Sequence, residues 1–208
     1  MPSPKKGSSS HGKGATSTDN PIQFAAAVYP HKKGKRRGLA RFVESLKKSR
    51  VRVAGILQEK VSMDDSGMSR VDAIDITTGQ RIPLNRPTRE NWKNRTCSLD
   101  VSALAETTAI LRRAIENRVD LIVVEKFGDE EREGKGLTNE IFQGIAAGIP
   151  LLIAVPDTNL DIWNDRSGGI GAVLPYEENA FHEWWISIQG ATVGSVRHDF
   201  RLGRIMAP

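Results

Sequence analysis

Three short apolar runs constrain the fold of this chain more than any other feature. They are QFAAAVY at 23–29, LIVV at 121–124 and LLIAV at 151–155. Each run is too short for a long helix, and an unbroken apolar run of this length is typical of a strand buried on both faces of a parallel sheet. The sequence therefore predicts an α/β domain whose central strands are covered by helices on both sides.

Segments with helical periodicity separate these strands. The apolar residues of 39–48 recur at the offsets of one helix face, and Asp100 is a good N-cap for a helix from about 101 to 117. Further helices are expected at 137–147 and 177–188, and further strands at 51–57 and 168–174. The alternation predicts a three-layer, mostly parallel, doubly wound sheet. In the last helix, Trp184 and Trp185 are expected to pack against the sheet, with a partner interface as the alternative.

The middle of the chain departs from this alternation. VDAIDI at 71–76 alternates apolar and polar residues, Thr78 and Gly79 supply a turn, and extended structure resumes at 81–82. This pattern predicts an inserted β-hairpin. The stretch 84–96 has no period and is expected to be a loop.

The charge is unevenly distributed along the chain. Its net charge is +5, yet residues 1–50 hold 12 Lys and Arg against only Asp19 and Glu44, so the rest of the chain is acidic. Residues 1–21 are rich in Ser, Gly and Lys without an apolar run, which indicates a disordered basic tail. We expect a single α/β domain over 22–189, followed by a C-terminal extension over 190–208 that has no clear period.

Several classes of protein are disfavoured by what the sequence lacks. It contains no apolar stretch long enough for a secretory signal or a membrane helix, which favours the cytoplasm. Cys97 is the only cysteine, so no intramolecular disulfide is possible. The four histidines lie far apart, so no metal site is expected.

Two loops follow predicted strands at the edge where parallel α/β sheets bind ligands. The first is HKKGKRRG at 31–38, and the second begins EKFGDEE at 125–131. A charged loop is often only a solvated surface, but an acidic residue that ends a buried strand is more often functional.

The blocks DITTG, LIVVEKFG and GIPLLIAVP carry a resemblance to a known family. Over about residues 24–156, the chain is similar to the small P-loop nucleoside triphosphatases of the thermophile and cancer-related type. It resembles still more closely a bacterial family catalogued as domain of unknown function 2478. The resemblance implies a P-loop NTPase type of fold.

The first loop departs from the P-loop pattern that the resemblance implies. G-x-x-x-x-G-K-[ST] wraps phosphates with backbone N–H groups, and its hydroxyl holds Mg²⁺. The matching positions here are Pro30 and Lys35 for the two glycines, Arg36 for the lysine and Arg37 for the hydroxyl residue. An anion is therefore expected on Gly34, Lys35, Arg36, Arg37 and Gly38, without tightly bound Mg²⁺.

The second loop also departs from the pattern that the resemblance implies. The resemblance implies an Asp-Glu pair that holds Mg²⁺ and orients the attacking water, whereas this chain has Glu125 and Lys126. Glu125 is the one candidate catalytic residue, since Lys126 is no base while protonated and its charge competes with Mg²⁺. Gly128 and Glu131 match the pattern of the turn.

Three functions remain open from the sequence. The leading hypothesis is a non-hydrolysing regulatory protein that binds a nucleotide or another oxyanion as its small anionic ligand; a protein partner stays open. The first alternative is a divergent nucleoside triphosphatase or nucleotide kinase, with Glu125 as its metal anchor. The second is a nucleic-acid binder, which is disfavoured because the domain is acidic and the basic segments contain few aromatic residues.

Overall fold

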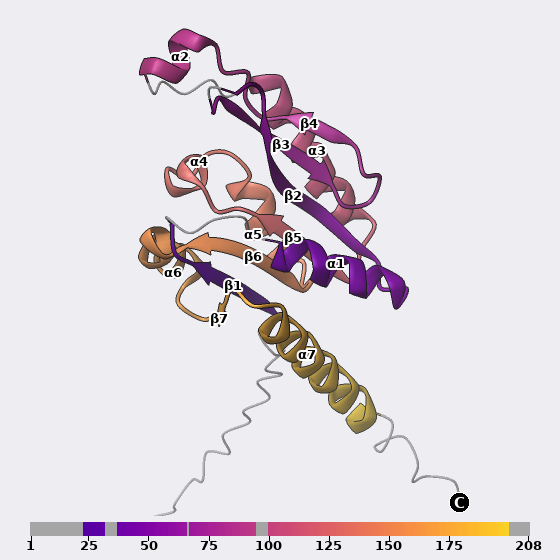
Figure 1. Cartoon of the computed structure of the whole chain (residues 1–208). Coiled ribbons are helices and arrows are strands. Elements are labelled where there is room, and N and C mark those ends of the chain that lie inside the picture. Colours follow the sequence, from indigo (N-terminus) through magenta and orange to yellow (C-terminus); the bar gives the residue numbers. More distant parts are fainter. Residues whose placement is uncertain (1–22, 32–36, 66, 95–99, 200–208) are drawn as a thin grey trace, which may run out of the picture.

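A seven-stranded sheet forms the centre of the protein (Figure 1). The computed structural model describes residues 23–31, 37–65, 67–94 and 100–199. Side by side, the strands are β4 (Arg81–Pro83), β3 (Ser69–Asp75), β2 (Val53–Ser62), β5 (Leu121–Glu125), β6 (Leu151–Pro156), β1 (Phe24–Tyr29) and β7 (Ala172–Pro175). The strands from β2 to β7 in this order are parallel, whereas β3 is antiparallel to both β2 and β4.

Helices cover both faces of this sheet. On one face lie α1 (Gly38–Lys48) and α7 (Glu178–Asp199), and on the other lie α3 (Val101–Glu116), α5 (Thr138–Ala146) and α6 (Leu160–Ser167). The short segments α2 (Arg89–Asn94), α4 (Asp129–Arg132) and η1 (Asp157–Asn159) lie in connections. The predicted α/β fold with a mostly parallel sheet is therefore confirmed.

The unbroken apolar runs are explained by burial on two sides. All five residues of β5 are buried, and their side chains alternate between the two cores. Leu121 and Val123 contact the core under α1 and α7, whereas Ile122 and Val124 contact the core under α3 and α5. The same alternation places the side chain of Glu125 on the α1/α7 face.

The predicted packing of the last helix is also confirmed. Trp184 and Trp185 are only 6% and 7% exposed and belong to the core between the sheet and α7. The helix itself continues through Gly190 to Asp199, although the sequence shows no clear period there.

One local prediction is wrong: residues 84–96 are not simply a loop. The short helix α2 forms within them, and its start is stabilised by Thr88, whose side-chain oxygen accepts a hydrogen bond from the Asn91 N–H at 3.1 Å. A capping threonine followed by a helix of only six residues gives no periodic signal in the sequence. The helix α6 was not predicted from the sequence either.

The antiparallel edge of the sheet is a ladder of three strands. β3 pairs with β2 along its whole length and with β4 through Asp72 to Ile74. Asp75 shapes the turn that follows, because its carboxylate accepts hydrogen bonds from the Thr77 N–H at 2.8 Å and the Thr78 N–H at 3.4 Å.

Within the described residues, no helix is long and apolar enough to cross a membrane.

Candidate functional site

The strand order identifies one switch point at the carboxyl edge of the sheet. β1 and β6 are neighbours, but the helix that follows β1 packs on one face and the helix that follows β6 packs on the other. In open α/β sheets, ligands bind where the connections of adjacent strands diverge in this way. The ends of β1 and β6 are therefore the candidate position for a ligand.

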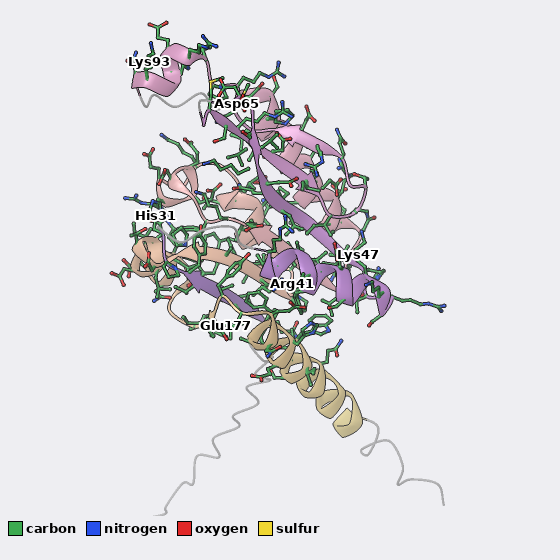
Figure 2. All side chains as sticks on the ribbon, viewed as in Figure 1. His31, Arg41, Lys47, Asp65, Lys93 and Glu177 are labelled. Atoms are coloured by element: carbon green, nitrogen blue, oxygen red, sulfur yellow. The ribbon has the colours of Figure 1, made fainter. Side chains whose placement is uncertain are left out.

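A hydrogen bond between a backbone N–H and a carboxylate joins the segments that follow β1 and β6. His31 follows the end of β1, and its N–H donates to Asp157 Oδ1 at 3.1 Å. Asp157 begins the turn after β6 and also accepts from the Thr158 N–H at 2.8 Å. Figure 2 labels His31 at this edge of the molecule. Asp157 was not predicted as a site residue, although it directly follows a buried strand, which is the signal used above for Glu125.

The described part of the first loop ends at the start of α1. Arg37 is the N-cap of this helix, is exposed, and accepts the Arg41 N–H on its carbonyl at 3.1 Å. Gly34, Lys35 and Arg36 lie outside the described residues. Gly38 lies close to an aromatic ring, since a Cβ built on it would stand 3.2 Å from Cε1 of Tyr176. The first turn of α1 contains no acidic residue, so its N–H groups favour an anion.

Glu125 is held at the end of β5 by hydrogen bonds. It is only 5% exposed; its Oε2 accepts from the Gln58 N–H at 3.3 Å and its Oε1 accepts from the Tyr176 hydroxyl at 3.2 Å. The peptide bond between Glu125 and Lys126 is cis. The sequence predicted Glu125 at the carboxyl end of a buried strand, but neither the burial of its carboxylate nor its tyrosine partner was predicted.

Tyr176 is itself fixed by its surroundings. It follows β7, and its N–H donates to the Val28 carbonyl at 3.0 Å. Its ring makes edge-on contacts with Tyr29, at a centroid distance of 5.6 Å, and with Phe181, at 5.4 Å. The side chain therefore connects the start of α1 at Gly38 with the carboxylate of Glu125.

The second loop is organised by Glu131, which turns inward. Its carboxylate accepts from the Gly128 N–H at 2.8 Å and from the Leu137 N–H at 3.1 Å, and the residue is 8% exposed. Burial raises the pKa of Glu131 above its ordinary value, against the opposing effect of these hydrogen bonds. Glu131 thus stabilises the turn around α4. Lys126 lies beside this turn, with its Cε 3.4 Å from a Cβ built on Gly128.

The turns that follow β5 and β6 are tied together. The side-chain amide of Asn159 donates to the Phe127 carbonyl at 3.2 Å, and the Phe127 N–H donates to the Ala154 carbonyl at 2.9 Å. The ends of both strands therefore form one connected edge.

Among the described residues, no group of three or more His, Cys, Asp or Glu could hold a metal ion.

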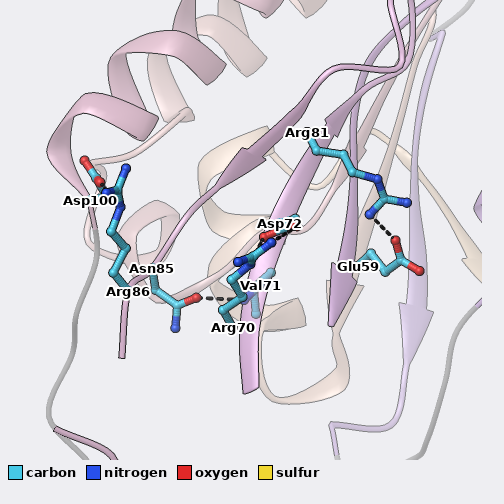
Figure 3. A network of polar contacts seen from close by, with 8 residues as sticks. All are labelled: Glu59, Arg70, Val71, Asp72, Arg81, Asn85, Arg86 and Asp100. Atoms are coloured by element: carbon cyan, nitrogen blue, oxygen red, sulfur yellow. Dashed lines mark hydrogen bonds and ion pairs between the residues drawn. The ribbon is translucent and has the colours of Figure 1, made fainter. Parts of the chain in front are cut away.

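The antiparallel edge of the sheet, formed by β2, β3 and β4, carries many charges, but they occur as pairs of opposite sign. Figure 3 shows Arg81 with Glu59, Arg70 with Asp72, and Arg86 with Asp100, and in the same network the Val71 N–H donates to Asn85. Because each arginine in this network faces a carboxylate, the network adds little net positive charge to the antiparallel edge.

Comparison with known proteins gives one relative and one family. The chain is 34% identical over 166 residues to the molybdenum import ATP-binding protein ModC 2 of Bradyrhizobium diazoefficiens. That alignment covers 80% of this chain but only 18% of ModC 2. No solved structure matches the chain. The family model described as "Protein of unknown function (DUF2478)" matches residues 24–184, and the chain belongs to this family.

Proposed function

We propose that this chain is a non-hydrolysing regulatory protein that binds a small anion, either a nucleotide or another oxyanion, at the edge where β1 and β6 end. The scaffold is a P-loop NTPase type of sheet in which β3 and β4 form an inserted hairpin. The observation that carries the proposal is the hydrogen bond from Tyr176 to Glu125 at 3.2 Å. It engages the one acidic side chain that could anchor a catalytic metal in the inherited position.

Hydrolysis of a nucleoside triphosphate needs parts that this edge lacks or has altered. A P-loop enzyme holds Mg²⁺ with a hydroxyl in its phosphate loop and orients water with a carboxylate or amide. Here Arg37 replaces the hydroxyl residue and Lys126 replaces the carboxylate. In the enzyme alternative, a divergent triphosphatase or kinase, a metal at Glu125 would share the carboxylate with the Tyr176 hydroxyl and the Gln58 N–H.

The name of the relative widens the choice of ligand. ModC 2 is called a molybdenum import ATP-binding protein. The aligned stretch is a minor part of that protein, so its ATP site need not lie within the stretch. Both a nucleotide and a molybdate-like oxyanion therefore belong among the candidate ligands.

We assign the anion to Gly34, Lys35, Arg36, Arg37 and Gly38, in a cytoplasmic protein. Arg36 and Arg37 directly precede α1 in the sequence, where the helix dipole adds to their charge, whereas Lys32 and Lys33 come earlier in the sequence. Replacing both arginines by alanine should weaken binding at every salt concentration, by roughly 1–3 kcal/mol. Reversing the charge of the two lysines should weaken it mainly at low salt. Equal losses that vanish together at high salt would mean that the loop is only a diffuse basic patch.

A thermal-shift panel with a parallel phosphate-release assay tests the function. The ligands are ATP and GTP with and without Mg²⁺, orthophosphate and molybdate, each at millimolar concentration, since stabilisation grows with ligand concentration over Kd. We expect at least one anion to raise the melting temperature and no phosphate to be released. Phosphate release that Glu125→Gln abolishes would instead establish the enzyme alternative. No stabilisation by any of these ligands would refute the binding function.

A further inference from the structure

We propose that the outer edge of β7 and the flank of α7 above it form an interface at which two copies of this chain pair. In the pair, β7 runs antiparallel to β7 of the second copy, so that the two sheets join into one. The inference does not depend on the ligand of the proposed function. Three features carry it: an open strand edge, a buried donor without an acceptor, and a stretch of sequence without charge.

The first feature is the open edge of β7. The strand is the last in the sheet, and among the described residues it pairs only with β1. The Tyr176 N–H donates to the Val28 carbonyl of β1. Because the N–H and C=O groups of successive strand residues point to alternate sides, those of Val173 point to the open side. Val173 is 51% exposed and Ile170 is 58% exposed, so this edge offers hydrogen-bonding groups beside apolar surface.

The second feature is a buried donor on α7. Trp184 is 6% exposed, and its Nε1–H has no hydrogen-bond acceptor among the described residues. Glu178 and His182 bond to α1 through Arg41 and Ser45. At about 100° per residue, Trp184 lies roughly 200° around the helix from His182, on the flank that faces away from α1. This flank lies above β7, whose residues belong to the same core (Figure 1). A buried donor without an acceptor is costly, and a partner across the edge can supply the acceptor.

The third feature is charge, and it selects the occupant. Residues 167–176 contain no charged side chain, although Lys, Arg, Asp and Glu make up 26% of the chain. The opposite edge of the sheet carries the ion pairs of Figure 3, and charges on an edge strand oppose pairing. An uncharged edge is matched by another uncharged edge, which a second copy of this chain supplies.

Antiparallel pairing centred on Val173 also fits the backbone. The two Val173 residues stand opposite each other and exchange both of their N–H to C=O hydrogen bonds. In this register Gly171 of one copy lies opposite Pro175 of the other. Proline has no N–H to donate, but its carbonyl accepts from the glycine, so each of these pairs keeps one hydrogen bond.

The flank of α7 supplies the larger part of the interface. A stable dimer buries about 800 Å² on each partner, which the four residues of β7 cannot provide. α7 has 22 residues and is therefore about 33 Å long. On it, Ser187 is exposed and donates its hydroxyl proton to the Trp184 carbonyl at 2.7 Å. The Ser187 oxygen can therefore accept the Trp184 N–H of the second copy.

The test is the molar mass of the full chain, measured by light scattering after size exclusion over a range of concentrations. Wild type should approach twice the mass of one chain. Val173→Lys places a charge at the centre of the edge and should raise the dissociation constant at least about tenfold. Hydrogen exchange gives a second readout, because the Val173 amide should exchange more slowly in the dimer. A wild type that keeps the mass of one chain even at millimolar concentration would overturn the inference.

Ile186→Lys is the matched control. Ile186 is also apolar and exposed, at 66%, but it lies roughly 200° around α7 from Trp184, on the other side of the helix. This variant should remain a dimer. If Val173→Lys does not fold, Ile170→Lys adds a charge beside the same edge and takes its place. An edge variant that stays dimeric, or an Ile186→Lys that becomes monomeric as well, would place the interface elsewhere and overturn the inference.

Discussion

Gly55 in β2 is the position where a single methyl group should damage the fold most. Its φ is +123°, a conformation that residues with a side chain rarely adopt. A Cβ built there would lie 2.0 Å from the Val123 carbonyl oxygen and 2.9 Å from the Val123 carbonyl carbon. Both atoms belong to the backbone of β5, so no rotation of a side chain can relieve the overlap.

The loss for Gly55→Ala is the sum of two costs. Holding alanine in a conformation reserved for glycine costs about 1–3 kcal/mol, and forcing packed backbone apart costs about 1–3 kcal/mol more. We therefore expect a loss of about 2–6 kcal/mol, which for a chain of this size corresponds to roughly 4–24 °C in Tm. Gly148 is the matched control, because its φ is +70° but a Cβ there meets nothing within 4 Å. Gly148→Ala should cost only about 1 kcal/mol.

Urea unfolding followed by tryptophan fluorescence measures both variants, since the chain contains four tryptophans. Equal losses from Gly55→Ala and Gly148→Ala would refute the close approach of β2 and β5. The same displacement should also affect the site, because Gln58 lies three residues beyond Gly55 and donates to Glu125. A folded Gly55→Ala protein should therefore bind the anion more weakly than Gly148→Ala.

Two further predictions concern α3 and the second loop. Asp100→Ala should cost about 1 kcal/mol in urea unfolding, because its carboxylate caps α3 by accepting from the Ser102 N–H at 2.9 Å, while Asp100→Asn should cost less. For Glu131, the folded-state pKa lies above the ordinary 4.5, so its contribution to stability is fully present below pH 4.5 and is lost as the pH rises through the raised value. Unfolding free energies of wild type relative to Glu131→Gln should therefore fall over that window, by at most about 1.4 kcal/mol per pH unit; a difference that is flat or rises with pH would contradict this.

The sequence predicts the parallel part of the fold well because its signals are local. An unbroken run such as LIVV can be buried only between two layers, and Asp100 marks the start of its helix by its own chemistry. The helix α2 is missed because six residues contain too few turns to show a period. The continuation of α7 through Gly190 is missed for another reason: a helix already started by packed residues can extend over residues that show no pattern of their own.

Residues of the candidate site also differ in whether a local sequence signal marks them. Glu125 is found from sequence because a charged residue ends an apolar strand, and a scan for such residues would also have found Asp157. Tyr176 carries no local signal, because it follows a short edge strand and its hydrogen-bond partner lies 51 residues away in sequence. Its contact with Glu125 depends on the order of the strands, which leaves only β1 and β6 between β7 and β5, and on a side chain long enough to cross their ends. Topology, and not the composition of either loop, places an aromatic side chain beside the only predicted metal anchor.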